Sequence, residues 1–268
     1  MNPTYHKSLR ILTILLAVSL TIVSIAGAFF PGTYERDAAS LAAQGAGQDL
    51  VDLFLAVPLL LVSFYRASKG RRIATLIYGG ILFYISYSFV IYCLGIHFNR
   101  FFLLYCMTLG LSLYAFILFM IAIRQQDVPN WFKDPPIRLL SGYILFVALV
   151  FYTLWLKSIV PAILTNGVPA DVADYGLLVN PVHVLDLAFA LPGLIIGSVL
   201  LWKRKSLGYI IASVALVFMV LLTIALAAMV VMLVVREINE DYTVALVFGM
   251  LSLLSITFSV LLFRSIVR

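Results

Sequence analysis

The stretch LVFMVLLTIALAAMVVMLVV, at positions 216–235, decides the fold class of this chain. It contains no charged residue, and its apolar side chains do not alternate with polar ones as they do in a half-buried β-strand. A helix needs about 20 apolar residues to cross the hydrocarbon core of a bilayer. The stretch therefore predicts a membrane-spanning helix, and it does not fit a transmembrane β-barrel, whose strands alternate.

The composition of the whole chain also indicates a membrane protein. Of its 268 residues, 63% are hydrophobic and 11% are charged, whereas a soluble domain carries about 25% charged residues. The net charge of +6 does not indicate nucleic-acid binding, because Lys and Arg occupy short segments between apolar runs rather than one surface. We therefore expect the lipid bilayer as a partner, and no nucleic acid.

Seven further apolar stretches have a comparable length. Together with the first they predict an all-α integral membrane protein with eight transmembrane helices. The predicted spans lie near 9–30, 49–66, 73–95, 101–123, 137–160, 182–202, 207–235 and 242–264. The first span ends in AGA, which resembles a signal-peptide cleavage site, but its apolar run of about 20 residues is longer than a usual signal-peptide core. We expect this span to be retained.

The basic residues predict the orientation of the helices. All but four of the 18 Lys and Arg residues lie in the two terminal segments and in the loops near 66–72, 124–136 and 203–206. Such residues accumulate on the cytoplasmic side of a membrane. We therefore expect both termini in the cytoplasm, and the loops at 31–48 and 161–181 outside.

The chain contains an internal similarity. QDLVDLFLAVP at 48–58 and VHVLDLAFALP at 182–192 each place an aspartate six residues before a proline, and Asp52 and Asp186 are separated by half the chain length. An even number of helices per unit keeps both units in the same orientation. We therefore expect one integral membrane unit built from two parallel four-helix repeats, 1–134 and 135–268, related by a pseudo-twofold axis along the membrane normal.

Two interpretations of Asp52 and Asp186 are open. In the first, each acid caps and orients its helix near the N-terminal end, where Asp49 and His183 precede them by three residues. In the second, both face a polar cavity between the halves, because ionisable residues inside membrane helices are costly and usually face the protein interior or water. The prolines that follow free backbone carbonyls for such a site.

A candidate metal site also lies at the predicted outer ends of the helices. IHFNR at 96–100 supplies His97 and Asn99. His97, His183 and Asp186 would offer two imidazoles and a carboxylate, with an open position for water. No sequence motif signals a cofactor. A divalent metal fits these residues, and two histidines could also be axial haem ligands, although no attachment motif accompanies them.

Arg36 is one of the few cations expected outside. It lies between two acids in FPGTYERD at 30–37, where a solvated salt bridge would contribute little. The alternatives are that Arg36 pairs with Asp52 or binds an anion. Residues 39–43 could form a short interfacial helix after this loop.

Several stretches carry a resemblance to a known family. FPGTYERD, GQDLVDLFLAVPLLLVS, YCLGIHFNRFFLLYCMTLGLSLYAF and NPVHVLDLAFALPGLIIGSVLLWKRKSLGY resemble a widespread family of bacterial multi-pass membrane proteins of uncharacterised function. The resemblance covers most of the chain and implies a bacterial plasma-membrane location, but it implies no activity. Glu35 departs from the family pattern. The matching residues are Tyr34, Arg36, Asp37, Gln48, Asp49, Gly95, Phe98, Asn99, His183 and Asp186.

The favoured function is binding or transport of a small molecule or cation through an outward-facing polar site. The outer face is rich in acids, which favours a small cationic solute. A membrane-embedded metal-dependent hydrolase acting on a lipid is the first alternative, and a non-catalytic subunit or sensor is the second, so an enzyme is not the favoured class. The oligomeric state does not follow from the sequence. The expected ligand-binding residues are Asp52, Asp186, His183, Asp49, Asn99, His97 and Arg36.

Overall fold

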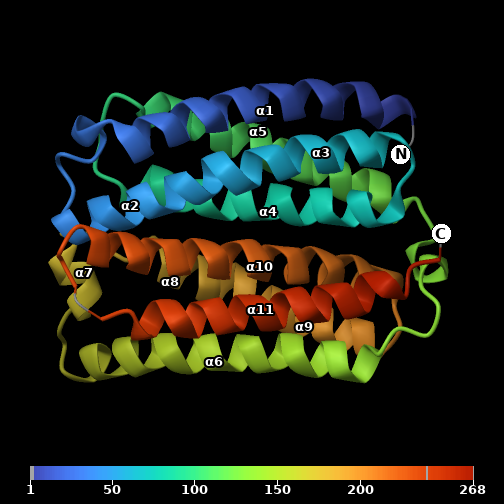
Figure 1. Cartoon of the computed structure of the whole chain (residues 1–268). Coiled ribbons are helices and arrows are strands. Elements are labelled where there is room, and N and C mark those ends of the chain that lie inside the picture. The colour runs from blue at the N-terminus through green and yellow to red at the C-terminus, as the bar shows by residue number, and fades with distance from the viewer. Residues whose placement is uncertain (1–2, 240, 268) are drawn as a thin grey trace.

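The computed structural model describes residues 3–239 and 241–267, which form an elongated bundle of helices (Figure 1). Within these residues, eight helical stretches are long and apolar enough to cross a membrane, which confirms the predicted number of spans and the all-α class. The eight apolar helices are compatible with a multi-pass membrane protein. The eight stretches are His6–Phe29, Ala39–Ser68, Arg72–Gly95, Phe102–Arg124, Ile137–Leu164, Pro181–Trp202, Ser206–Val235 and Thr243–Arg264.

Some of these stretches comprise several elements. The α-helices are α1 (Pro3–Phe29), α2 (Ala39–Val51), α3 (Val57–Ser68), α4 (Arg72–Gly95), α5 (Phe102–Arg124), α6 (Ile137–Leu164), α7 (Ala170–Asp174), α8 (Pro181–Leu185), α9 (Leu191–Trp202), α10 (Ser206–Val235) and α11 (Thr243–Arg264). Two π-helical turns, η2 (Asp52–Ala56) and η4 (Asp186–Ala190), join α2 to α3 and α8 to α9. Short 3-10 turns, η1 (Pro31–Thr33) and η3 (Val128–Trp131), lie in loops.

The second span begins ten residues earlier than the predicted position 49. Helix α2 starts at Ala39, so residues 39–43 are its first turn and do not form the separate interfacial helix that the sequence suggested. Alanine favours helix, and the small residues of ASLAAQGAGQ let this segment pack closely against other helices. The prediction failed because these small residues lower the hydropathy of a segment that is nevertheless helical.

The same order of elements occurs in both halves of the chain. In each, an aspartate opens a five-residue π turn, a 12-residue α-helix follows, and a longer helix comes after a short basic turn. The longer helices are α4 in the first half and α10 in the second. The rotation that would superpose the halves stays a prediction.

Helix α10 joins the two halves. It packs against α2 and α4 of the first half as well as against α9 and α11 (Figure 1). Close approach depends on glycine: a Cβ atom on Gly47 of α2 would lie 2.7 Å from the carbonyl oxygen of Ala228 in α10, and one on Gly80 of α4 would overlap Val217. Glycine therefore sets the spacing between the halves.

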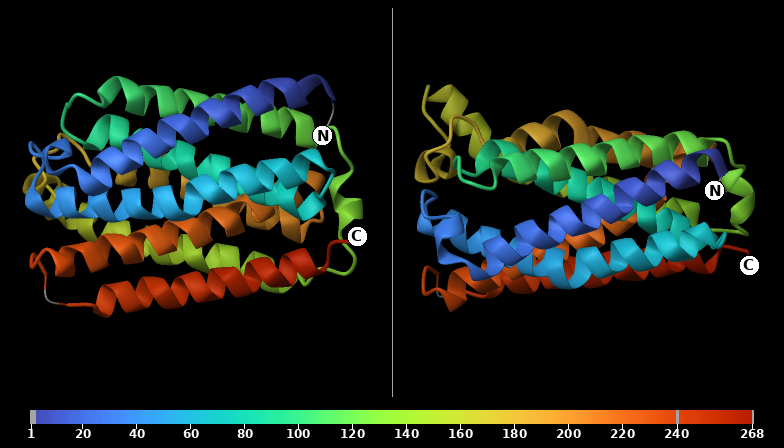
Figure 2. Two further views of the ribbon diagram at one scale, coloured as in Figure 1. Left: turned by 45° about the horizontal axis from the view of Figure 1, so that its top comes forward. Right: turned by 90° about the horizontal axis from the view of Figure 1, so that it is seen from above.

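Both termini lie at the same end of the bundle (Figure 2). At this end the tail after α11 contacts the connection between the halves: Val267 N donates to Trp131 O at 2.8 Å, and Lys133 N donates to Ser265 O at 2.7 Å. Large apolar side chains are exposed along most helices, which is the surface that lipid would cover. Cys93 and Cys106 are free.

Candidate binding cavity

Each of the paired aspartates opens a π turn. The backbone N–H of the residue five positions later, Val57 or Leu191, donates to the carbonyl oxygen of Asp52 or Asp186. The proline one position further has no N–H, so it cannot form the regular bond to the fourth residue before it. The sequence pattern thus produces the same local change in both halves, and π turns are frequent at functional sites.

Neither aspartate caps a helix, so the first interpretation of these acids is wrong. Helix α2 begins at Ala39, more than three turns before Asp52. Helix α8 is capped by Asn180, whose Oδ1 accepts a hydrogen bond from Val182 N at 2.9 Å. The carboxylates are therefore free for contacts with other helices.

Asp186 is buried and accepts hydrogen bonds from two helices. Tyr87 Oη of α4 donates to Oδ1 at 2.8 Å, and Trp155 Nε1 of α6 donates to Oδ2 at 2.7 Å. A tyrosine from the first half and a tryptophan from the second thus hold the carboxylate in place. Neither donor brings a positive charge.

His183 lies one turn before Asp186, against the Trp155 ring, with 4.8 Å between ring centroids. Its Nε2 atom is buried and has no hydrogen-bond partner among the described residues. It lies 3.5 Å from Oδ2 of Asp171, which accepts a hydrogen bond from Asn180 Nδ2 at 2.6 Å. Asp171 therefore belongs to the same cluster, although it was not among the residues expected to bind a ligand.

These groups line a cavity of about 430 Å³ between the two halves. It lies near α7, at the end of the bundle opposite the termini (Figure 1). Among the described residues, its lining includes the carboxylates of Asp171 and Asp186 but no Lys or Arg. Its polar and aromatic lining comprises Gln44, Gln48, Tyr87, Ser88, Tyr92, Phe151, Trp155, Ser158, Asp171, Tyr175, Asn180, His183, Asp186 and Phe248.

The segment after α7 is tied to the first half at this cavity. Gln44 Nε2 of α2 donates to Tyr175 Oη at 3.0 Å. Because Tyr175 and Leu177 also line the cavity, this segment forms part of its wall near the loop end of the bundle.

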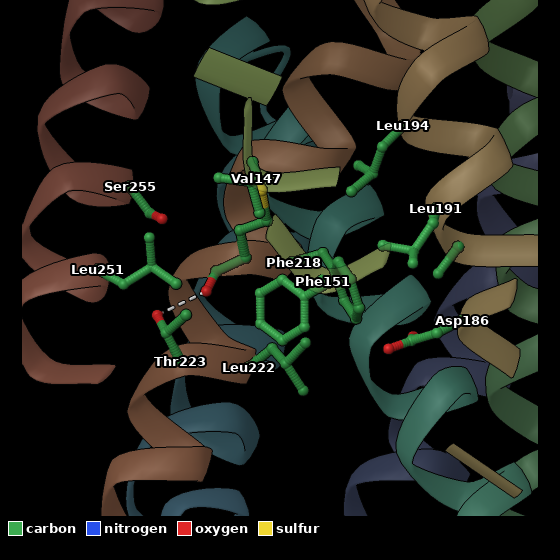
Figure 3. Close-up of a pocket in the computed structure, with 12 residues that line it drawn as sticks. Val147, Phe151, Asp186, Leu191, Leu194, Phe218, Leu222, Thr223, Leu251 and Ser255 are labelled. Atoms are coloured by element: carbon green, nitrogen blue, oxygen red, sulfur yellow. Dashed lines mark hydrogen bonds between the residues drawn. The ribbon is translucent and has the colours of Figure 1, made fainter. Parts of the chain in front are cut away.

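A second, small pocket of about 20 Å³ adjoins Asp186. Figure 3 shows Asp186 on one side of this pocket, with Thr223 of α10 and Ser255 of α11 on the other. A volume of about 10–15 Å³ is enough for one water molecule. Asp186 thus lies between the large cavity and a water-sized space deeper in the second half.

Asp52 and Asp49 lie outside the large cavity. Asp52 accepts a hydrogen bond from Tyr84 Oη at 2.9 Å and from Gln48 Nε2 at 3.2 Å. Asp49 accepts from Tyr92 Oη at 3.0 Å and from the Tyr34 hydroxyl. Both carboxylates are buried, and of this network Gln48 and Tyr92 reach the cavity.

Tyr34 precedes α2 and remains a hydrogen-bond donor. Its burial, together with the neighbouring Asp49 carboxylate, raises the pKa of Tyr34 well above its ordinary value of about 10. The phenol therefore keeps its proton at neutral pH and donates a hydrogen bond to Asp49.

The remaining candidates lie in the loops outside the cavity. His97 Nδ1 lies 2.8 Å from Asp37 Oδ1, and Asn99 Nδ2 donates to Thr33 O at 3.2 Å. Arg36 is exposed and donates to Phe98 O at 2.9 Å, so it does not pair with Asp52. These contacts hold the loop after α1 and the loop after α4 together.

The three candidate metal ligands do not assemble. His97 pairs with Asp37, whereas His183 and Asp186 lie in the cavity. Within the part of the chain that the structure describes, no three His, Cys, Asp or Glu side chains come together as a metal site. The residues present therefore do not fit the metal that the sequence suggested.

The sequence interpretation missed the aromatic half of the site. Tyr87 and Trp155 lie within apolar spans and carry no pattern of their own. A usable signal existed: the O–H of Tyr and the N–H of Trp need a partner when buried in a membrane, and the aspartates are the few acceptors available there.

No family model matches the chain, and neither the search of curated proteins nor that of solved structures found a match. Function must therefore be argued from the cavity itself.

Proposed function

We propose that this protein binds a small organic cation in the cavity between its halves, on the side of the membrane opposite its termini. The observation that carries the proposal is the acidic cavity of about 430 Å³, whose described lining contains Asp186 and Asp171 but neither Lys nor Arg. Cavities for small molecules span about 300–1,000 Å³.

Electrostatics favours a cationic ligand. Among the described residues, carboxylates contact basic side chains in only two places, and both bases are histidines. A buried carboxylate without a positive partner is costly, and hydrogen bonds from Tyr87 and Trp155 offset only part of that cost. A bound cation would supply the missing charge.

The aromatic lining indicates the kind of cation. Trp155, Tyr87 and Tyr175 line the same space as the two carboxylates. Aromatic faces attract alkylated ammonium groups, which have few or no hydrogen bonds to lose when they leave water. A quaternary ammonium compound suits these walls better than a strongly hydrated metal ion.

We further propose that the membrane is a bacterial plasma membrane and that both termini lie in its cytoplasm. The bias of Lys and Arg towards the terminal end of the bundle supports this orientation. The cavity then opens outward. Transport fits the same site, because the cavity lies between the two halves of the chain, where many transporters bind their substrates.

The proposal can be tested with choline and dimethylbutanol, its uncharged carbon isostere. In a protein with Trp131→Phe and Trp202→Phe, Trp155 is the one remaining tryptophan of the chain. Choline should change the Trp155 emission saturably, and dimethylbutanol should leave it unchanged at the same concentration. Equal responses to the two compounds, or no response to choline and to a panel of larger quaternary ammonium ions, would show that the cavity does not select organic cations.

A further inference from the structure

A second hollow lies at the other end of the molecule. It is a groove of about 1100 Å³ at the turn between α3 and α4, the end where the termini lie (Figure 1). It is remote from the acidic cavity and shares no lining residue with it. Its walls comprise Leu59, Val62, Ser63, Tyr65, Arg66, Lys69, Gly70, Arg71, Arg72, Ile73, Ala74, Ile77, Ile266 and Val267.

One side of the groove is strongly basic. Arg66, Lys69, Arg71 and Arg72 line it, and no described acidic residue does. None of the four forms an ion pair with a carboxylate in the described structure. Four like charges within seven positions repel one another unless anions neutralise them.

Two of these cations are held in place, but not by acids. The Arg72 guanidinium lies 5.7 Å from the centre of the Trp131 ring and donates to Val267 O at 3.0 Å. The Lys69 ammonium lies 5.6 Å from the centre of the Tyr65 ring. These contacts fix the wall of the groove and leave the positive charges uncompensated.

The other side of the groove is apolar and runs along the membrane spans. Leu59 and Val62 of α3 face the same space as Ile73 and Ile77 of α4. Leu59 precedes Arg66 by two helical turns, so the apolar wall extends roughly 10 Å from the level of the charges at 1.5 Å per residue. The groove thus combines a cationic end with an apolar channel.

We propose that this groove binds an anionic phospholipid, with the phosphate near Arg66, Lys69 and Arg71 and one acyl chain along α3 and α4. Charge complementarity selects an anion, and basic pockets of this kind on the cytoplasmic side bind acidic headgroups. A free phosphate would use the basic end but not the apolar wall. The two-part lining therefore favours a lipid over a soluble anion.

The experiment compares two lipids of equal chain length and two matched triple variants. Purified full-length protein in detergent is titrated with phosphatidylglycerol or phosphatidylcholine, and bound lipid is counted by native mass spectrometry. The groove variant carries Arg66→Gln, Lys69→Gln and Arg71→Gln. The control carries Lys203→Gln, Arg204→Gln and Lys205→Gln, which removes the same charge from the turn between α9 and α10, outside the lining of this groove.

The wild-type protein should bind phosphatidylglycerol at least about tenfold more tightly than phosphatidylcholine, and the groove variant should lose that preference while the control keeps it. If both variants lost the preference for phosphatidylglycerol equally, the preference would come from the general surface charge and not from this groove. Equal affinity for the two lipids would overturn the proposal. Full competition by glycerol phosphate would show a soluble-anion site instead.

Photocrosslinking keeps the proposal testable if the groove variant does not fold. A photoreactive residue replaces the exposed Val62 on the apolar wall, and another replaces the exposed Leu113 of α5, outside this groove, as the control. Crosslinks to phosphatidylglycerol should form at position 62 in excess over those to phosphatidylcholine, with no such excess at position 113. Equal excess at both positions would contradict a specific groove. Neither experiment depends on the cation cavity, so one proposal can fail without the other.

Discussion

Asp49, Asp52 and Asp186 are buried carboxylates that receive their hydrogen bonds from aromatic hydroxyls, an indole and an amide rather than from Lys or Arg. Such donors orient a carboxylate without cancelling its charge. The roles of the three acids then depend on whether the carboxylate faces a cavity. Asp186 lines the open cavity, whereas Asp49 and Asp52 are enclosed by side chains of the first half.

The enclosed network should contribute to stability. Tyr92→Phe removes the hydroxyl that donates to Asp49 and leaves that oxygen with one donor fewer. The free energy of unfolding should fall by about 1–3 kcal/mol, measured by thermal unfolding in detergent. Tyr114→Phe removes the same hydroxyl from an exposed side chain and should have little effect. Equal stability of the two variants would mean that the Asp49 network does not support the fold.

At this scale the sequence predicted part of the site. Asp186 and His183 could be found because acids and imidazoles are rare in apolar helices. Asp52 was grouped with them on the same ground but lies outside the cavity. Asp171 could not be found in this way, because its place beside His183 depends on how α7 packs. The indole of Trp155 indicates that an acceptor is needed, but not that Asp186 is this acceptor. Arg36, His97 and Asn99 were grouped with the site by residue type, yet they hold loops together.

Among the elements, α10 makes the close contacts with α2 and α4 of the first half. Gly47→Ala should push α2 away from α10, because the added Cβ would meet the backbone at Ala228 and Met229. We expect a loss of about 1–3 kcal/mol in the free energy of unfolding, as for other overpacked sites. The measurement is thermal unfolding in detergent.

The control for this variant is Gly110→Ala in α5, where a Cβ would meet no atom within 4 Å. Alanine there should leave stability unchanged or raise it by up to about 1 kcal/mol, since glycine weakens a helix. If Gly47→Ala were as stable as Gly110→Ala, the halves would not be in the close contact described.

Most of the elements could be predicted from the sequence, because long apolar runs and charged turns mark the spans directly. The π turns could not be predicted as such. The prolines at positions 58 and 192 showed that one backbone hydrogen bond of each helix is missing. Whether the helix then kinks or forms a π turn depends on the packing of all the residues in the turn. The start of α2 was misplaced because hydropathy does not register helices made of Ala, Gly and Gln.

At the scale of the whole molecule, the common location of both termini constrains the topology. The charge bias predicts that this end is cytoplasmic. In a protein with both cysteines replaced by alanine, Val168→Cys should react with an impermeant thiol reagent in intact cells, and Ser206→Cys should react only after permeabilisation. Both positions are exposed, at opposite ends of the bundle. The reverse pattern would invert the topology and direct the cation cavity inward.

The central claim is that the Asp186 carboxylate binds a small organic cation. The most direct measurement is calorimetric titration of purified full-length protein with choline, comparing Asp186→Asn with Asp241→Asn. Asp241 is an exposed loop acid whose pKa is lowered by hydrogen bonding to Thr243, so its variant removes a negative charge outside the lining of the cavity. Asp186→Asn should weaken binding at least about tenfold, and Asp241→Asn should bind like the wild-type protein. Equal choline affinity in the Asp186→Asn and wild-type proteins would contradict the account.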